Sequence, residues 1–187
     1  MAANSFMVPL GTPAPAFDLT AVNGGSVALD DFKGSPATLV TFLSNHCPYV
    51  RHIETALGAL ATGYGSRLSV VAICSNDSVT YPDDDATHLA EQVARAGFTF
   101  PYLLDETQET AKAYRAACTP DFFLYDGELR LVYRGQFDDS RPGNDIPVTG
   151  ASLRAAIDAV LAGEPVSADQ RPSIGCGIKW KPGNAPA

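Results

Sequence analysis

The fold is decided by residues 37–50, which read ATLVTFLSNHCPYV. Residues 37–43 are apolar or β-branched, a run typical of a central parallel strand that is buried on both faces. Pro48 fits the first turn of a helix, where a missing N–H costs nothing, and Asn45 is a candidate N-cap. We therefore predict a strand, a tight turn, and a helix that runs to about Gly63.

The segments on either side complete an α/β pattern. Residues 13–28 predict a β-hairpin that turns at Asn23-Gly24-Gly25, because Asn-Gly between extended segments is a strong hairpin signal. A strand–helix–strand crossover is right-handed and makes its two strands parallel. The pattern therefore predicts a mixed sheet flanked by helices, with an antiparallel edge pair that turns at Asp126-Gly127. Downstream of the first helix, we predict strands at residues 68–74, 98–103, 122–125 and 129–133, and helices at residues 86–96, 107–116 and 152–162.

The chain has 187 residues, which is enough for one α/β domain with a single core and short for two. We predict one domain over residues 1–187, with residues 163–187 as a C-terminal extension. That tail is rich in Pro and Gly but contains an apolar piece at residues 174–180, which includes the only tryptophan, Trp180. Tryptophan is seldom left in water, so we expect the tail to dock back on the domain.

The formal net charge of −8 argues against non-specific binding to nucleic acid or to anionic lipid. No apolar run is long enough to span a bilayer. The first residues lack the basic and apolar regions of a secretory signal, so we expect a cytoplasmic protein. The acidic run Asp83-Asp84-Asp85 indicates a solvated loop or a helix start rather than a metal site.

Four cysteines are scattered along the chain, at Cys47, Cys74, Cys118 and Cys176. They include no C-x-x-C pair and no paired zinc spacing, so we expect neither a disulfide scaffold nor a metal or other cofactor. In a reducing compartment such cysteines are either inert core residues or the site of chemistry.

Cys47 is the candidate nucleophile because it opens the predicted helix. The unsatisfied N–H groups and the dipole at a helix N-terminus favour a thiolate. The carboxyl end of a central parallel strand is also where open α/β sheets place their sites. Arg51 and His52 lie about one turn further on, so we expect at least one of them to face the sulfur. The alternative is an inert, buried cysteine.

Several sequence blocks together resemble the redoxin branch of the thioredoxin superfamily. They are similar in particular to bacterial peroxiredoxin-like proteins, the alkyl hydroperoxide reductase/thiol-specific antioxidant-like group. The resemblance covers nearly the whole chain and implies a thioredoxin fold. The blocks are residues 11–19 (GTPAPAFDL), 29–34 (LDDFKG), 45–51 (NHCPYVR), 118–121 (CTPD), 133–140 (YRGQFDDS) and 175–180 (GCGIKW).

The resemblance also implies roles for single residues. Thr119-Pro120 would be the cis-proline loop that faces Cys47, where an extended substrate can pair beside the sulfur. Ser44 matches the hydroxyl position of a peroxiredoxin motif, but Val40 stands where that motif has proline.

A second departure is that Val50 takes the place of the second cysteine of a C-x-x-C motif, so exchange within the helix turn is unavailable. Cys118, two residues before the proline, would then be the first candidate to resolve the intermediate, or else a small buried residue. Cys176 is the second candidate, if the tail returns to the site. Cys74 is expected in the core.

A cation that stabilises thiolate and peroxide would come from Arg134 or Arg51. Arg134 fits a surface position on an edge strand equally well.

The sequence therefore predicts a thiol-dependent oxidoreductase, in which Cys47 attacks a protein disulfide or a small peroxide. Disulfide exchange is favoured slightly because Val40 breaks the peroxidase pattern, and thioredoxin or glutathione is the expected reductant. Two alternatives stay open: a non-catalytic redox sensor or binding module, and capture of copper(I) or zinc by His46, Cys47 and Cys118. A homodimer is compatible with the sequence.

Overall fold

The computed structural model describes residues 2–186, and its centre is a seven-stranded mixed sheet with the order β3-β2-β6-β5-β4-β8-β9. Strands β4, β5 and β6 are parallel, whereas β8 and β9 add to one side and β2 and β3 to the other in antiparallel fashion. The predicted mixed sheet, N-terminal hairpin and antiparallel edge pair are confirmed. The strands are β2 (Asp18–Ala21), β3 (Ser26–Ala28), β4 (Ala37–Phe42), β5 (Ser69–Cys74), β6 (Tyr102–Leu104), β8 (Asp121–Asp126) and β9 (Leu131–Gly135).

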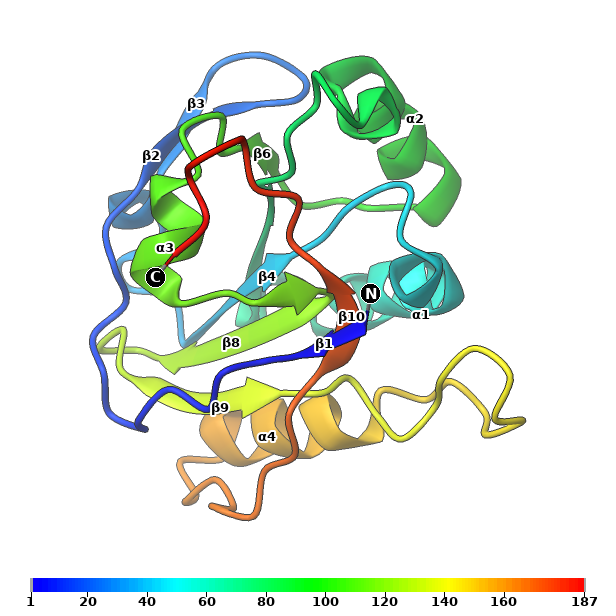
Figure 1. The fold of residues 1–187 in the computed structure, drawn as a ribbon. Coiled ribbons are helices and arrows are strands. Elements are labelled where there is room, and N and C mark those ends of the chain that lie inside the picture. The colour runs from blue at the N-terminus through cyan, green and yellow to red at the C-terminus, as the bar shows by residue number, and fades with distance from the viewer. Residues whose placement is uncertain (1, 187) are drawn as a thin grey trace.

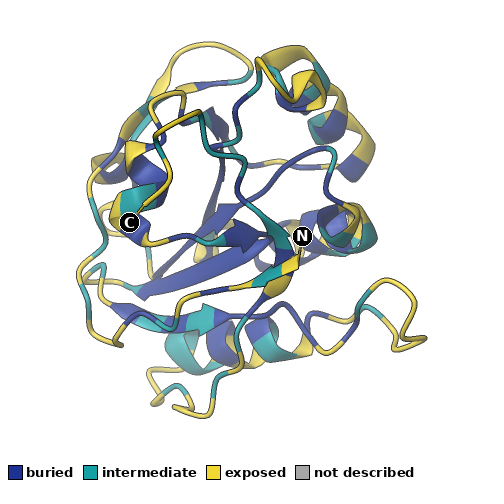
Figure 2. Ribbon diagram, in the orientation of Figure 1, coloured by how far each residue is buried: buried dark blue, intermediate teal, exposed yellow. Residues whose placement is uncertain are grey.

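Helices cover both faces of this sheet (Figure 1). Successive side chains of a strand point to opposite faces, so Leu39 and Val40 of β4 enter two separate cores. The core around Leu39 is closed by α1 (Pro48–Tyr64), α2 (Ala86–Ala96) and α4 (Ala151–Leu161). The core around Val40 is closed by α3 (Glu109–Tyr114) and the 3-10 segment η1 (Leu29–Phe32). Figure 2 shows the result, with buried central strands and helices whose outer faces are exposed.

A second, three-stranded sheet joins the two ends of the chain. Its order is β1-β10-β7, formed by β1 (Ala2–Asn4), β10 (Ile174–Gly177) and β7 (Cys118–Thr119). The expected docking of the tail is confirmed, because β10 pairs with both β1 and β7 and Trp180 packs against the second core. Figure 1 shows β10 beside β1. None of the helices within residues 2–186 has the length and apolar character needed to cross a membrane.

Two predicted elements are shorter in the structure. Strand β6 begins at Tyr102 rather than at residue 98, because Pro101 has no N–H for a strand ladder. Phe98 and Phe100 instead stack on each other, with ring centroids 4.6 Å apart. Helix α3 ends at Tyr114, because the next residue, Arg115, adopts a left-handed conformation with φ of 55°.

Candidate active site

The turn between β4 and α1 carries Cys47. The residue is the N-cap of α1, with φ of −73° and ψ of 121°, and Pro48 follows at the first helical position. The prediction that Asn45 is the N-cap is wrong, because its side-chain amide donates to the carbonyl of Asp83 at 2.8 Å. Cys47 is 0% exposed and belongs to the first core.

The loop that contains Pro120 faces Cys47, as the resemblance implied. The Thr119–Pro120 peptide bond is cis. The Cys47 thiol donates to the carbonyl of Thr119 at 3.1 Å, and the hydroxyls of Ser44 and Thr119 lie 3.0 Å apart. The structure therefore brings Cys47, Ser44, Thr119 and Pro120 together, but the buried Ser44 hydroxyl already has a hydrogen-bonding partner.

Cys176 is the second thiol of the site. Strand β10 pairs with β7 so that Cys176 lies opposite Thr119, whose carbonyl holds the Cys47 sulfur. Burial and the neighbouring Cys47 raise the pKa of Cys176. Cys176 is also partly exposed, whereas Cys47 is buried.

Cys118, the first resolving candidate from the sequence, points to a different partner. It is fully buried, and its thiol lies 3.6 Å from the carbonyl of Pro120. Burial and the neighbouring Asp121 raise the pKa of its thiol. Cys74 is buried in the first core as predicted, and burial also raises its pKa. All four cysteines are free thiols.

The three candidate cations form hydrogen bonds that lead away from the sulfur. Arg51 donates to the carbonyl of Asn45 at 2.6 Å, and the His52 ring lies 2.7 Å from the hydroxyl of Ser140. These contacts do not support the expectation that Arg51 or His52 faces Cys47. Arg134 lies on the edge strand β9 and donates to the carbonyl of Val8 and to the side chain of Gln170, the alternative placement predicted from the sequence.

Sequence reasoning missed Asp84, which lies under the active-site turn. Its carboxylate accepts from the backbone N–H groups of Asn45 and His46 at 2.7 and 3.2 Å and from the Asn76 amide at 2.7 Å. One of its oxygens also lies 2.6 Å from Nδ1 of His46. The expectation of a solvated acidic run is therefore wrong for the buried Asp84, although Asp85 does cap α2. The three consecutive aspartates are identical in type, so nothing in the sequence signals that the middle one is buried under the turn.

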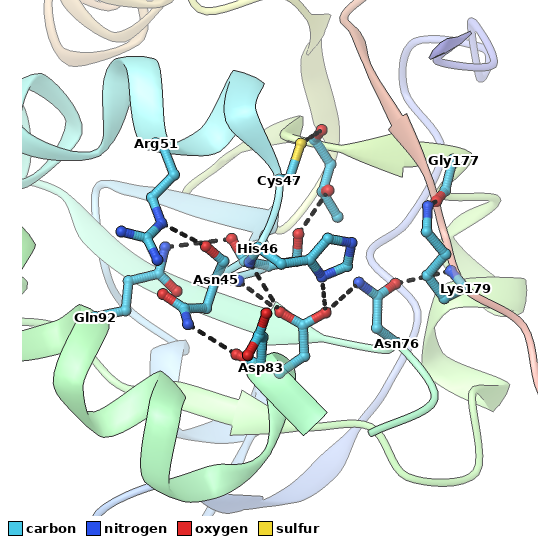
Figure 3. Close-up of polar contacts among 12 residues, drawn as sticks. Asn45, His46, Cys47, Arg51, Asn76, Asp83, Gln92, Gly177 and Lys179 are labelled. Carbon is cyan, nitrogen blue, oxygen red and sulfur yellow. Dashed lines mark hydrogen bonds and ion pairs between the residues drawn. The ribbon is translucent and has the colours of Figure 1, made fainter. Parts of the chain in front are cut away.

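These contacts fix the orientation of His46, the residue before Cys47. The carboxylate oxygen of Asp84 accepts, so Nδ1 of His46 is the donor in this hydrogen bond. The ring stacks on Tyr81 with centroids 5.5 Å apart. Asn76 continues the network, because its side-chain oxygen Oδ1 accepts from the backbone N–H of Lys179 at 2.8 Å. The turn that holds Cys47 is thus connected to the chain just after β10 (Figure 3).

Metal capture receives no support from the arrangement. Within the described part of the chain, no group of three or more His, Cys, Asp or Glu side chains is placed to hold a metal ion.

A thiol at a helix start that faces a cis-proline loop beside a mixed sheet defines a redoxin-like protein of the thioredoxin superfamily. The chain belongs to the AhpC/TSA family, whose profile matches residues 10–134.

The similar proteins agree with this placement. The chain is 27% identical over 131 residues to the thiol-disulfide oxidoreductase ResA of Geobacillus kaustophilus (strain HTA426), covering 68% of this chain and 71% of that protein. An uncharacterized conserved protein from Geobacillus kaustophilus has a crystal structure with a TM-score of 0.95 and 54% identity, and 97% of each chain is covered. A putative thiol:disulfide interchange protein DsbE from Chlorobium tepidum shares the fold, with a TM-score of 0.66, 21% identity, and coverage of 82% of this chain and 98% of that chain. The predicted thioredoxin fold is confirmed.

Proposed function

We propose that the protein is a thiol-dependent oxidoreductase in which Cys47 is the nucleophile and Cys176 is the resolving cysteine. The observation that carries the proposal is the pairing of β10 with β7, which places Cys176 opposite Thr119, the residue whose carbonyl accepts from the Cys47 thiol beside the cis-proline. Cys118, which the sequence favoured for resolution, has its nearest hydrogen-bonding contact with Pro120 instead.

The reaction proceeds in two exchange steps. The Cys47 thiolate attacks one sulfur of a substrate disulfide, and the other substrate sulfur leaves as a thiolate that takes up a proton. The Cys176 thiol then loses its proton and attacks the Cys47 sulfur of the mixed disulfide, which releases the second substrate thiol. Two electrons have passed to the substrate, and a Cys47–Cys176 disulfide remains. Thioredoxin or glutathione, in a cytoplasmic setting, is the proposed reductant.

Three features favour disulfide exchange over peroxide reduction. The hydroxyl of Ser44 is engaged with Thr119, and the guanidinium of Arg134 is engaged with Val8 and Gln170. Val40 remains in the place of the motif proline. A catalytic peroxide site needs donors aimed at the reacting oxygens. The name of the relative from Geobacillus kaustophilus, a thiol-disulfide oxidoreductase, supports the same choice.

The burial of Cys47 favours a second candidate function, a redox sensor that oxidises once and then changes a partner surface. An enzyme and a sensor would both form the internal disulfide between Cys47 and Cys176, so turnover is what separates them. An enzyme is oxidised and reduced repeatedly when a reductant is present, whereas a sensor reacts once for each oxidation event.

The test compares turnover of a disulfide reporter, with glutathione as recycling reductant, in the natural protein and two variants. We expect Cys47→Ser to abolish turnover, because the serine hydroxyl is no nucleophile toward sulfur under these conditions. Cys74→Ser places a hydroxyl in an equally buried position and is expected to retain turnover. Activity that survives Cys47→Ser rules out the proposal, and a single stoichiometric oxidation without recycling identifies the sensor.

A further inference from the structure

Strand β10 occupies the place beside Cys47 where an extended polypeptide would pair. A polypeptide substrate adds to a sheet edge through main-chain hydrogen bonds. Here the edge next to the cis-proline is β7, and β10 already pairs with it, with Cys176 opposite Thr119 and Gly177 opposite Cys118. The chain's own Cys176 therefore stands where the cysteine of a bound polypeptide would stand.

The fit between β10 and this edge is close. A Cβ atom on Gly175 would lie 2.0 Å from the carbonyl oxygen of Thr119, so only glycine allows the strand to lie there without movement. The same oxygen accepts the hydrogen bond from Cys47. The tail therefore packs directly on the atom that holds the reactive sulfur.

Contacts on both sides hold β10 in this position. On its outer edge β10 pairs with β1, and the N–H of Ser173 donates to the hydroxyl of Ser5 at 2.8 Å. After the strand, Ile178 is buried, and the backbone of Lys179 bonds to Asn76 and to the N–H of Asp77. A polypeptide must displace this whole strand, whereas a small molecule needs only local movement around the partly exposed Cys176.

We propose that β10 excludes extended polypeptides from Cys47 and makes the site selective for small disulfides; this inference rests on the proposed function. In the reaction, the Cys47 thiolate breaks the S–S bond of a small disulfide RSSR, and RS⁻ leaves and is protonated. Cys176 then gives up its proton and displaces the second RS⁻, which is protonated in turn. The net change is one RSSR reduced to two RSH and one protein dithiol oxidised to a disulfide.

The experiment measures how fast the reduced protein forms its internal disulfide with oxidised glutathione and with insulin. The natural protein is expected to react faster with oxidised glutathione. Gly175→Ala forces β10 away from Thr119 and is expected to raise the insulin-to-glutathione rate ratio about tenfold or more, which corresponds to about 1.4 kcal/mol of opening free energy. Gly63→Ala is the matched control, since its added methyl meets no atom within 4 Å, and leaves the ratio unchanged.

Ile178→Ala loosens the same strand from its other end and must shift the ratio in the same direction, which covers the case in which Gly175→Ala does not fold. Equal or faster reaction of the natural protein with insulin overturns the inference and leaves the proposed function intact. An insulin-to-glutathione ratio that stays unchanged in the folded Gly175→Ala and Ile178→Ala variants also overturns the inference and leaves the proposed function intact. If neither disulfide oxidises the natural protein, the proposed function and the inference fall together.

Discussion

The chemistry of single residues depends on which sulfur lies beside Cys47. Cys176 lies opposite Thr119, whose carbonyl accepts from the Cys47 thiol, and in the proposed reaction Cys176 attacks the mixed disulfide on Cys47. Cys118 is fully buried and lies against the carbonyl of Pro120. The two residues lie on paired strands beside the same sulfur, and the proposed function assigns resolution to Cys176.

Serine substitution of each residue separates these roles. We expect Cys176→Ser to stop turnover at the mixed disulfide on Cys47, because the resolving nucleophile is gone. Cys118→Ser should retain turnover within about threefold, since its thiol takes no part in the reaction. Burial of the serine hydroxyl should lower the free energy of unfolding by about 1–3 kcal/mol. Intact-protein mass spectrometry of the trapped adduct and steady-state rates measure the two effects. Turnover by Cys176→Ser together with its loss in Cys118→Ser would reverse the assignment.

The sequence predicted the residues of the site that lie in local motifs, whereas those that depend on long-range contacts needed the structure. Cys47 and the Thr119-Pro120 loop follow from a strand-to-helix turn and a short motif. The choice of Cys176 required the path of the tail, and Asp84 required the packing of the segment before α2 under the active-site turn. Neither contact leaves a periodic pattern in the sequence.

At the scale of elements, helix α1 holds Cys47 in position by packing closely against α2. A Cβ atom on Gly58, within α1, would lie 2.4 Å from the carbonyl oxygen of Ala96 at the end of α2. The two helices can approach this closely only because residue 58 has no side chain.

Two alanine substitutions in α1 are therefore expected to have opposite effects. Gly58→Ala should lower the free energy of unfolding by about 1–3 kcal/mol, because the methyl group overpacks the contact with α2. Gly63→Ala should raise it by about 0.5–1 kcal/mol, because alanine is the better helix former and the site is open. Urea unfolding of both variants gives the comparison. Equal effects of the two changes would show that the α1–α2 contact is not tight.

Most elements were predictable because their patterns are local: the buried run of β4, the turn of the β2–β3 hairpin and the full extent of α2. The ends of elements were less predictable. Pro101 delays β6, and the left-handed Arg115 ends α3 early. Such ends are set by single backbone conformations, which hydrophobic periodicity does not report.

At the scale of the whole molecule, the stability of the fold should depend on pH through Asp121, the residue after the cis-proline. Its carboxyl is fully buried, and Oδ2 accepts one long hydrogen bond of 3.3 Å from Ala117. Among the described residues, Oδ1 has no partner. Burial therefore raises the pKa of Asp121 well above its usual value.

A raised pKa means that the folded state keeps a proton that the unfolded chain releases above about pH 3.9. The contribution of Asp121 to the free energy of unfolding is therefore fully present below that pH, and it is lost as the pH rises toward the folded-state pKa. Asp121→Asn removes the titration, so its stability relative to the natural protein should grow between pH 4 and pH 8, by about 1.4 kcal/mol for each unit of pKa difference. Urea unfolding at both pH values measures it. A stability difference that is independent of pH would show that Asp121 is ionised in the fold.

The three-stranded sheet β1-β10-β7 lies over the turn that carries Cys47. Strands β1 and β10 close the edge at β7, so the sheet that joins the two ends also covers Cys47. The same strand carries Cys176, so under the proposed function the strand that covers Cys47 also supplies the resolving thiol.

The most direct test of the account is non-reducing peptide mass mapping of the natural protein after mild oxidation with a small disulfide. We predict one internal disulfide that joins Cys47 to Cys176, with Cys74 and Cys118 recovered as free thiols. A Cys47–Cys118 disulfide, or a Cys47 that stays unmodified, would contradict it.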